Sequence, residues 1–208
     1  KENALTSLEQ LSRRADQLPL MQHVLNRLYE RARHGDGAMV LTYADYQAIG
    51  GLKGAIDAHA DEILADLGPE VSALAEPVFR ALVSGTTLSN AVRDPKRFGD
   101  LVALAGGDRS AVVRLVDAFR AQGCSFLRPE PEVPLEDDTI VDLGHESLIR
   151  QWSAMSGWLD KEARDGATWA RIVTAQEANA AGEGDLLRGL DLANASSWWS
   201  AAEPTRAW

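Results

Sequence analysis

The stretch TIVDLGHESLIRQW, residues 139 to 152, reads as a short β-strand that runs directly into an amphipathic helix. Ile140, Val141 and Leu143 are residue types that favour strands. From Glu146 onward, apolar residues recur with helical spacing on one face, namely Leu148, Ile149, Trp152, Met155 and Leu159. This change of period predicts a strand-to-helix junction at the centre of the stretch.

His145 lies at that junction, which permits two interpretations. The first turn of a helix has unpaired N–H groups and the positive end of the helix dipole, so it favours an anion. An imidazole there could donate a further hydrogen bond to a phosphate. The plainer interpretation is that His145 only joins the strand to the helix. Spacing alone favours the plainer interpretation, because helix starts are far commoner than bound phosphates.

The residues before this stretch predict a winged helix-turn-helix. Residues 125 to 128 read as a second strand, and residues 129 to 138 form an acidic, proline-rich loop. We expect helices from 71 to 83, 98 to 105 and 108 to 122. Three helices followed by two strands around a loop are the pattern of a winged helix. The third helix would then be the recognition helix, and the loop would be the wing.

Local capping patterns predict where several elements begin and end. Thr42 and Asp45 form a variant capping box for a short helix that stops at a glycine pair, before another helix around residues 56 to 67. Asp108 is a good N-cap. Pro77 predicts a kink or a delayed helix start. Residues 84 to 97 are polar and rich in turn formers, and they predict a loop.

The two ends of the chain are also predicted to be helical. Residues 3 to 15 would form a helix that breaks at 16 to 19, with Pro19 opening a second helix that ends near Gly35. At the other end, the helix after His145 would run to about Glu162, and Gly166 would separate it from the next helix. A turn at residues 182 to 184 precedes the last helix, which begins around Leu186 and ends in a tryptophan pair. Six tryptophans, all but one beyond residue 155, indicate a surface that docks against a neighbouring domain.

Composition excludes several classes of protein. The 208 residues carry a formal charge of −10, which disfavours binding to nucleic acid or to an anionic membrane. The single cysteine, Cys124, excludes an internal disulfide and indicates a cytoplasmic protein. We find no membrane-spanning run and no secretory signal. The chain opens on Lys1, so we expect it to be part of a longer protein.

No catalytic site is apparent. The stretch GGLKG at residues 50 to 54 lacks the spacing and the hydroxyl of a P-loop. The histidines, His23, His34, His59 and His145, are scattered without metal-ligand spacing. Cys124 follows a helix C-terminus, where the dipole raises the thiol pKa and disfavours a role as a nucleophile. The carboxylates Asp57, Asp61, Glu62 and Asp66 have the spacing of a solvated helix face.

Four stretches of the chain together resemble a known family. They are QLPLMQHVLNRLYE at 17 to 30, LTYADYQAIGGLKGAIDAHADEIL at 41 to 64, VDLGHESLIRQWSAMSGWLD at 141 to 160 and LLRGLDLANASSWW at 186 to 199. They are similar to the region behind the nucleotide-binding core of STAND-class NTPases. These signalling switches are related to NLR proteins. The resemblance is to the bacterial novel STAND NTPase 1 type, which is often fused to WD repeats.

The resemblance implies a role for two residues. Leu18-Pro19-Leu20 resembles the GLPL motif of the lid domain, with Gln17 in place of glycine, and the proline of that motif lines the adenine pocket. Gly144-His145-Glu146 resembles the MHD motif of the winged-helix domain, with glycine for methionine and glutamate for aspartate. The histidine of that motif contacts the β-phosphate of ADP. Pro19 and His145 are therefore the implied nucleotide-binding residues, and the resemblance favours the phosphate-contacting interpretation of His145.

These patterns predict a mainly α fold in three parts. Residues 1–66 would form a helical lid-like bundle, 67–162 a winged helix-turn-helix with a small β-hairpin, and 163–208 a helical extension. The resemblance implies that the whole protein is an ATPase-type switch that binds ADP or ATP with Mg²⁺. This chain itself would be non-catalytic and would hold no nucleotide alone. Its partners would be an upstream P-loop NTPase domain of the same chain and downstream sensor repeats, with no membrane.

Two other functions stay open. One is a DNA-binding winged helix, favoured by Arg109, Arg114 and Arg120 on the expected recognition helix. Asp108 and Asp117 on the same helix, and the acidic chain as a whole, oppose it. The other is a helical adaptor that has no nucleotide role. A P-loop upstream in the parent protein would separate this adaptor from the switch.

Overall fold

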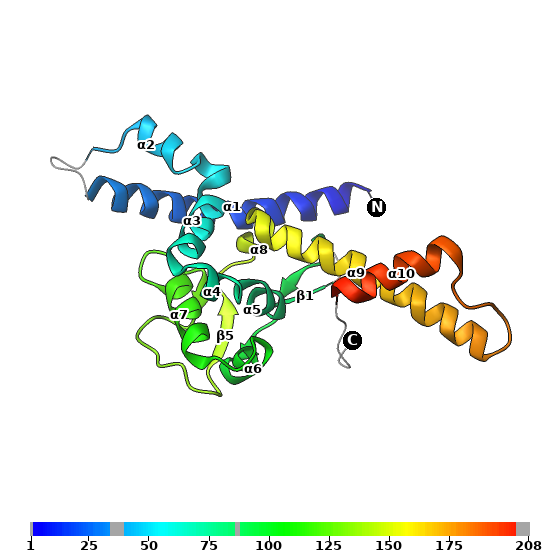
Figure 1. The fold of residues 1–208 in the computed structure, drawn as a ribbon. Coiled ribbons are helices and arrows are strands. Elements are labelled where there is room, and N and C mark those ends of the chain that lie inside the picture. Colours follow the sequence, from blue (N-terminus) through cyan, green and yellow to red (C-terminus); the bar gives the residue numbers. More distant parts are fainter. Residues whose placement is uncertain (1, 34–39, 86–87, 203–208) are drawn as a thin grey trace. The chain divides into compact units, whose positions relative to one another are not determined.

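The fold is described from a computed structural model covering residues 2–33, 40–85 and 88–202, without the side chains of residues 2–17 and 53. The chain divides into two compact units, residues 1–157 and residues 158–208. As predicted, the described residues are mainly helical, with a few short antiparallel strand pairs (Figure 1). The predicted division at residues 66 and 162 stays a prediction.

The first helix differs from the prediction. Helix α1, Glu2–Arg33, is continuous and contains Pro19, so the expected break at residues 16 to 19 is wrong. A proline inside a helix costs one hydrogen bond and crowds the preceding turn. Packing offsets that cost, because Leu20, Val24 and Leu28 are buried along α1 just after it. The predicted helix end near Gly35 lies outside the described residues.

The next two helices follow the predicted caps. Helix α2 spans Tyr43–Ala48 and helix α3 spans Gly51–Leu67. The capping box is confirmed, because the Asp45 N–H donates to Thr42 Oγ1 over 3.1 Å and the Thr42 N–H donates to Asp45 Oδ2 over 3.1 Å. Gly50 has a φ of 84° between the two helices, a conformation that glycine adopts without strain.

The middle of the chain contains more structure than predicted. Helix α4 spans Pro69–Ser72 and helix α5 spans Ala75–Ala81, so the helix predicted from 71 to 83 is two helices, and the second starts late, with Pro77 in its first turn. The expected loop after it contains strands β1, Val83–Ser84, and β2, Val92–Arg93, which pair antiparallel. Two-residue strands are too short for an alternating pattern, so sequence periodicity did not reveal them.

The helices and strands expected for the winged helix are present. Helix α6 spans Phe98–Leu104 and helix α7 spans Arg109–Arg120. Asp108 caps α7, since its side chain accepts from the Ala111 N–H over 3.0 Å. Strands β4, Leu127–Arg128, and β5, Ile140–Leu143, pair antiparallel as predicted. Strand β3, Lys96–Arg97, which was predicted as loop, pairs with the other edge of β5, giving the order β3-β5-β4.

Aromatic rings form the centre of the first unit. Phe79 on α5 packs against Phe119 on α7 with ring centroids 4.7 Å apart. The ring centroid of Trp152 lies 5.0 Å from that of Phe79 and 5.6 Å from that of Phe119, and Trp152 is fully buried. The core therefore lies between the helices of the middle segment and the residues that follow β5.

Trp152 also ends a helix that was predicted to continue. Helix α8 spans only Ser147–Gln151, and α9, Ser153–Ala180, begins immediately after it. Asp57 on α3 accepts from both the N–H and the hydroxyl of Ser153, each over 2.8 Å, and Asp61 accepts from Trp152 Nε1 over 2.9 Å. Asp61 is exposed, as the predicted solvated face requires, and Asp57 is half-buried; the carboxylates of both residues also fix the break. Glu62 on the same helix pairs with Arg27.

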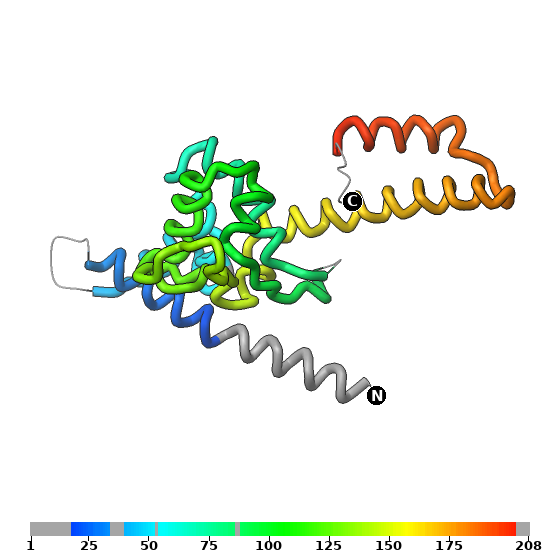
Figure 2. The backbone as a smooth tube through the Cα atoms, turned by 90° about the horizontal axis from the view of Figure 1, so that it is seen from below, coloured from blue at the N-terminus to red at the C-terminus, as the bar shows by residue number. Residues whose placement is uncertain are grey.

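The second unit contains the rest of α9 and helix α10, Gly189–Ala202. The chain turns back after α9, so the two helices run in opposite directions (Figure 2). The predicted separation at Gly166 is wrong, because one glycine inside a helix costs only about 1 kcal/mol. Trp169 contacts Trp198 and Trp199, at 6.3 and 5.8 Å between ring centroids, and Trp198 Nε1 donates to Asp165 over 2.8 Å. Docking of this surface against a neighbouring domain stays a prediction.

Within residues 2–33, 40–85 and 88–202, no helix is both long enough and apolar enough to cross a bilayer.

Candidate functional site

Pro19 and His145, the two residues implied to bind nucleotide, line the same pocket. Its volume is about 460 Å³, and it lies within the first unit. One wall comes from α1 and the other from the segments around β4 and the end of β5. The lining residues are Pro19, Gln22, His23, Asn26, Ile56, Gly123, Cys124, Ser125, Phe126, Arg128, Gly144, His145 and Ser147.

Local hydrogen bonds fix the ring of His145. Its Nδ1 accepts from the Ser147 N–H over 3.0 Å and lies 3.1 Å from the Ser147 hydroxyl oxygen. A backbone N–H can only donate, so Nδ1 of the neutral ring carries no proton. The proton is therefore on Nε2, and the ring has an N–H donor at that atom.

The first turn of helix α8, Ser147–Gln151, offers a weaker dipole and fewer N–H donors to an anion than a long helix would. Helix α8 has only five residues, so few peptide dipoles align behind its first turn. The Ser147 N–H, which would have faced an anion, donates to the His145 ring instead. The Ser147 N–H is therefore already engaged, and the contact of His145 with a phosphate stays a prediction.

Gly144 is required by a close backbone approach. A Cβ at this position would lie 2.2 Å from the backbone oxygen of Ser125, far closer than any real contact. The Gly144 N–H donates to the Phe126 oxygen over 2.8 Å, which holds the two segments together. Ser125 has a φ of 52°, an uncommon value for a residue with a side chain. A methionine at position 144 could not be accommodated in this arrangement.

The turn before β4 connects the two walls. Asn26 on α1 donates from Nδ2 to the Gly123 oxygen over 2.6 Å. The Cys124 thiol donates to the Phe119 oxygen over 3.2 Å. Burial raises the pKa of Cys124 to about 12, so the thiol stays protonated and is no nucleophile.

Two histidines that are far apart in the sequence meet at the α1 wall. His59 Nδ1 lies 3.3 Å from His23 Nε2, and the His23 ring stacks on Phe126 at 4.8 Å between centroids. Burial, with Arg27 close by, lowers the pKa of His23 to about 4 and that of His59 to about 3. Both rings are neutral at neutral pH. Sequence reasoning missed this pair because nothing in local spacing connects α1 to α3.

The described lining of the pocket contains no carboxylate, although the chain as a whole is acidic. Among its described lining residues none is Asp or Glu, and the charged side chain is that of Arg128. A region free of carboxylates with one cation and a histidine N–H donor favours an anionic ligand. No group of three or more His, Cys, Asp or Glu that could hold a metal ion occurs within the described parts of the chain. His34 lies outside those parts.

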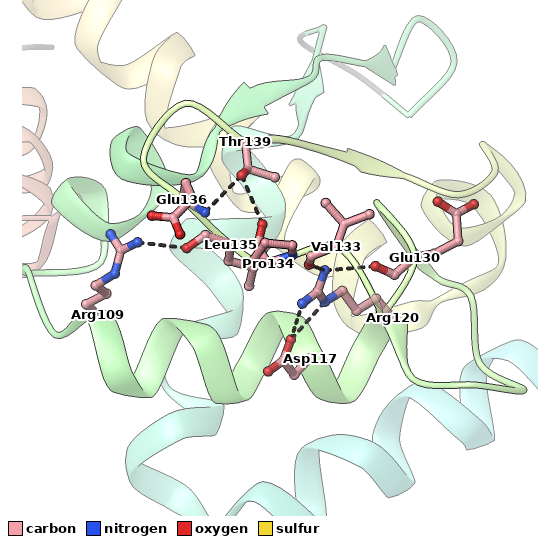
Figure 3. Close-up of polar contacts among 9 residues, drawn as sticks. All are labelled: Arg109, Asp117, Arg120, Glu130, Val133, Pro134, Leu135, Glu136 and Thr139. Atoms are coloured by element: carbon pink, nitrogen blue, oxygen red, sulfur yellow. Dashed lines mark hydrogen bonds and ion pairs between the residues drawn. The ribbon is translucent and has the colours of Figure 1, made fainter.

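Arg109 and Arg120 of helix α7 make contacts within the chain (Figure 3). Arg120, only 5% exposed, donates from Nη1 to the backbone oxygens of Glu130 and Val133 over 3.0 and 2.7 Å. Arg109 donates from Nη2 to the Leu135 oxygen over 2.7 Å, and its guanidinium lies 5.0 Å from the Phe98 ring centre. These two arginines therefore fasten the 129–138 loop to α7.

Comparison with known proteins identifies the family. No curated protein and no solved structure matches the chain. The family model for Novel STAND NTPase 1 matches residues 2–183, which is most of the 208 residues and includes both walls of the pocket. The chain therefore belongs to the Novel STAND NTPase 1 family.

Proposed function

We propose that this chain is the regulatory, non-catalytic lid and winged-helix portion of a STAND signalling NTPase, and that it senses whether ADP or ATP is bound. The observation that carries the proposal is the pocket that Pro19 and His145 share, although they are far apart in the sequence of the first unit. The nucleotide would be held mainly by an upstream P-loop domain of the same protein.

The residues of the pocket fit part of a nucleotide. A volume of about 460 Å³ lies within the range of small-molecule sites. The carboxylate-free lining, the Nε2 donor of His145 and the Arg128 guanidinium suit a phosphate group. A bound nucleotide would supply the negative charge, and His145 would donate to it from Nε2 while Ser147 holds the ring by Nδ1.

The proposed switch follows from differential binding. A ligand shifts a conformational equilibrium only when it binds one state better than the other. A histidine that contacts a phosphate of ADP in the closed state, and loses that contact with ATP, meets this requirement. One charge-assisted hydrogen bond is worth about 1.5–3 kcal/mol, enough to change the ratio of two states by about tenfold or more.

We assign the winged helix to helices α5, α6 and α7 with the hairpin β4–β5, in residues 67–162.

DNA binding by this winged helix is the weaker alternative. The guanidiniums of Arg109 and Arg120 hold the 129–138 loop, and Arg114 reaches the Leu67 oxygen over 3.5 Å. A recognition helix needs its cations free for phosphates and bases. We expect no binding to duplex DNA at low salt, measured by fluorescence anisotropy.

The remaining parts of the proposal concern the whole protein. Downstream sensor repeats would receive the signal, and the protein would act in the cytoplasm. A helical adaptor without a nucleotide role is the other alternative. It predicts no P-loop upstream and no effect of the pocket residues on nucleotide binding, so the same experiment separates it from the switch.

The test measures release of fluorescently labelled ADP from the full-length protein. His145→Ala removes the Nε2 donor and should accelerate release by about tenfold or more. His145→Asn is the informative variant, because its side-chain oxygen can still accept from the Ser147 N–H while the ring donor is lost. It should also accelerate release. Unchanged release in a folded His145→Ala protein would overturn the proposal.

A further inference from the structure

Arg128 and Glu130 form an ion pair beside the pocket. Arg128 ends strand β4 and lines the pocket together with His145. Its guanidinium binds the Glu130 carboxylate, and the two side chains are 53% and 58% exposed. The cation of the pocket is therefore also the partner of a carboxylate that is not among the lining residues.

The backbone at Glu130 is held in place by helix α7. Arg120 donates from Nη1 to the Glu130 oxygen over 3.0 Å and to the Val133 oxygen over 2.7 Å (Figure 3). Arg120 is itself buried and paired with Asp117 through Nε over 2.8 Å. Glu130 therefore remains anchored at its backbone when its side chain gives up Arg128.

We propose that Arg128 is a second anion-binding side chain of the pocket and that Glu130 competes with the anion for it. The anion would be a phosphate of a nucleoside diphosphate, so the inference rests on the function proposed above. Without ligand, Arg128 binds Glu130. With ligand, Arg128 and His145 bind the phosphate from the same wall, and Glu130 is left exposed to solvent.

The relative strengths of the two contacts favour this exchange. An ion pair between exposed side chains contributes little, because water screens it and both side chains lose freedom. An arginine can bind a phosphate through two N–H donors at once, and the doubly charged phosphate attracts it more strongly than one carboxylate does. Leaving Glu130 in water costs little, since its side chain is already largely exposed.

The test uses a double-mutant cycle in the full-length protein with labelled ADP. Arg128→Ala should accelerate ADP release by about tenfold, the effect of losing one charge-assisted contact. Glu130→Gln should act in the opposite direction and slow release by about threefold, because the competitor is removed. In the Arg128→Ala background, Glu130→Gln should have no effect, since there is no guanidinium left to compete for.

A matched control separates the pocket from a general change of charge. Arg31 on α1 is also 53% exposed and also pairs with a carboxylate, that of Asp45, but it is not a lining residue. Arg31→Ala should leave ADP release unchanged. If Arg128→Ala behaves like Arg31→Ala while His145→Ala still accelerates release, the role of Arg128 is wrong and the proposed function stands. If His145→Ala also has no effect, the proposed function itself fails. If Glu130→Gln still slows ADP release in the Arg128→Ala background, the effect comes from long-range electrostatics on the bound anion. That result would overturn the proposed competition for Arg128.

Discussion

The two walls of the pocket use histidine in opposite ways. On the α1 wall, His23 is buried against His59 and Phe126, and its pKa is lowered to about 4. On the wall formed by the end of β5, His145 is half-buried and held through one nitrogen by Ser147. Both rings line the pocket, but His23 is buried among other rings whereas His145 is half-buried and fixed through one nitrogen.

This contrast shows what burial decides. A ring enclosed by other rings cannot gain a charge without losing its packing, so His23 and His59 act as a neutral hydrogen-bonded pair between α1 and α3. A ring fixed at one edge keeps its orientation while its other nitrogen can donate to a ligand. We therefore expect substitutions at His23 and His59 to affect stability and substitutions at His145 to affect ligand binding.

The largest expected effect tests this division directly. His23→Ala should lower the free energy of unfolding of the chain by about 3–4 kcal/mol, because a buried ring and its contacts are lost. His145→Ala should cost about 1 kcal/mol, the usual value of one helix-capping contact. Urea unfolding of both variants measures the difference. Equal losses would show that the two walls contribute alike to stability.

The second prediction concerns pH. Below pH 6.5 the unfolded histidines take up protons that the folded His23 and His59 do not bind, so stability falls as the pH drops toward the folded pKa values of about 4 and 3. We expect a loss of about 3 kcal/mol between pH 7 and pH 5, measured by urea unfolding. His59→Gln can still donate to His23 and should reduce this loss to about half. An unchanged pH dependence in His59→Gln would contradict the assignment.

The third prediction tests the wall formed by the end of β5. Gly144→Ala places a methyl group against the Ser125 backbone oxygen, where a Cβ would lie at 2.2 Å, and should destabilise the chain by about 2 kcal/mol. Gly157 on α9 is the control, because a Cβ there meets nothing within 4 Å. Gly157→Ala should stabilise the chain slightly, as alanine favours helix. Equal thermal midpoints for the two variants would show that the approach of Gly144 to Ser125 is not rigid.

The smallest expected effect is the absence of activity in the isolated chain. Its two walls offer a histidine donor and an arginine, but the sequence has no P-loop to cradle the phosphates of ATP. We expect no ATP turnover above a heat-inactivated control and no micromolar ATP binding by calorimetry. Either activity would place the chemistry in this chain and require a different role for the pocket.

The amino-acid sequence by itself determined the features that depend on neighbours a few residues apart. The Thr42–Asp45 capping box and the Asp108 cap join residues that are three positions apart, so residue types alone specify their hydrogen bonds. The antiparallel pairing of β4 with β5 followed from two strand-like stretches on either side of one loop. The family also followed from sequence motifs, and it is the basis of the prediction that Pro19 and His145 bind nucleotide.

Only the tertiary structure decided the features that depend on residues distant in the chain. The break between α8 and α9 is fixed by Asp57 and Asp61, about ninety residues earlier, as their contacts with Ser153 and Trp152 show. The contact of His23 with His59, and the pocket that Pro19 and His145 share, likewise require α1, α3 and the β4–β5 hairpin to pack together. Hydrophobic periodicity describes one element at a time, and it contains no information on which side chains from different elements come into contact.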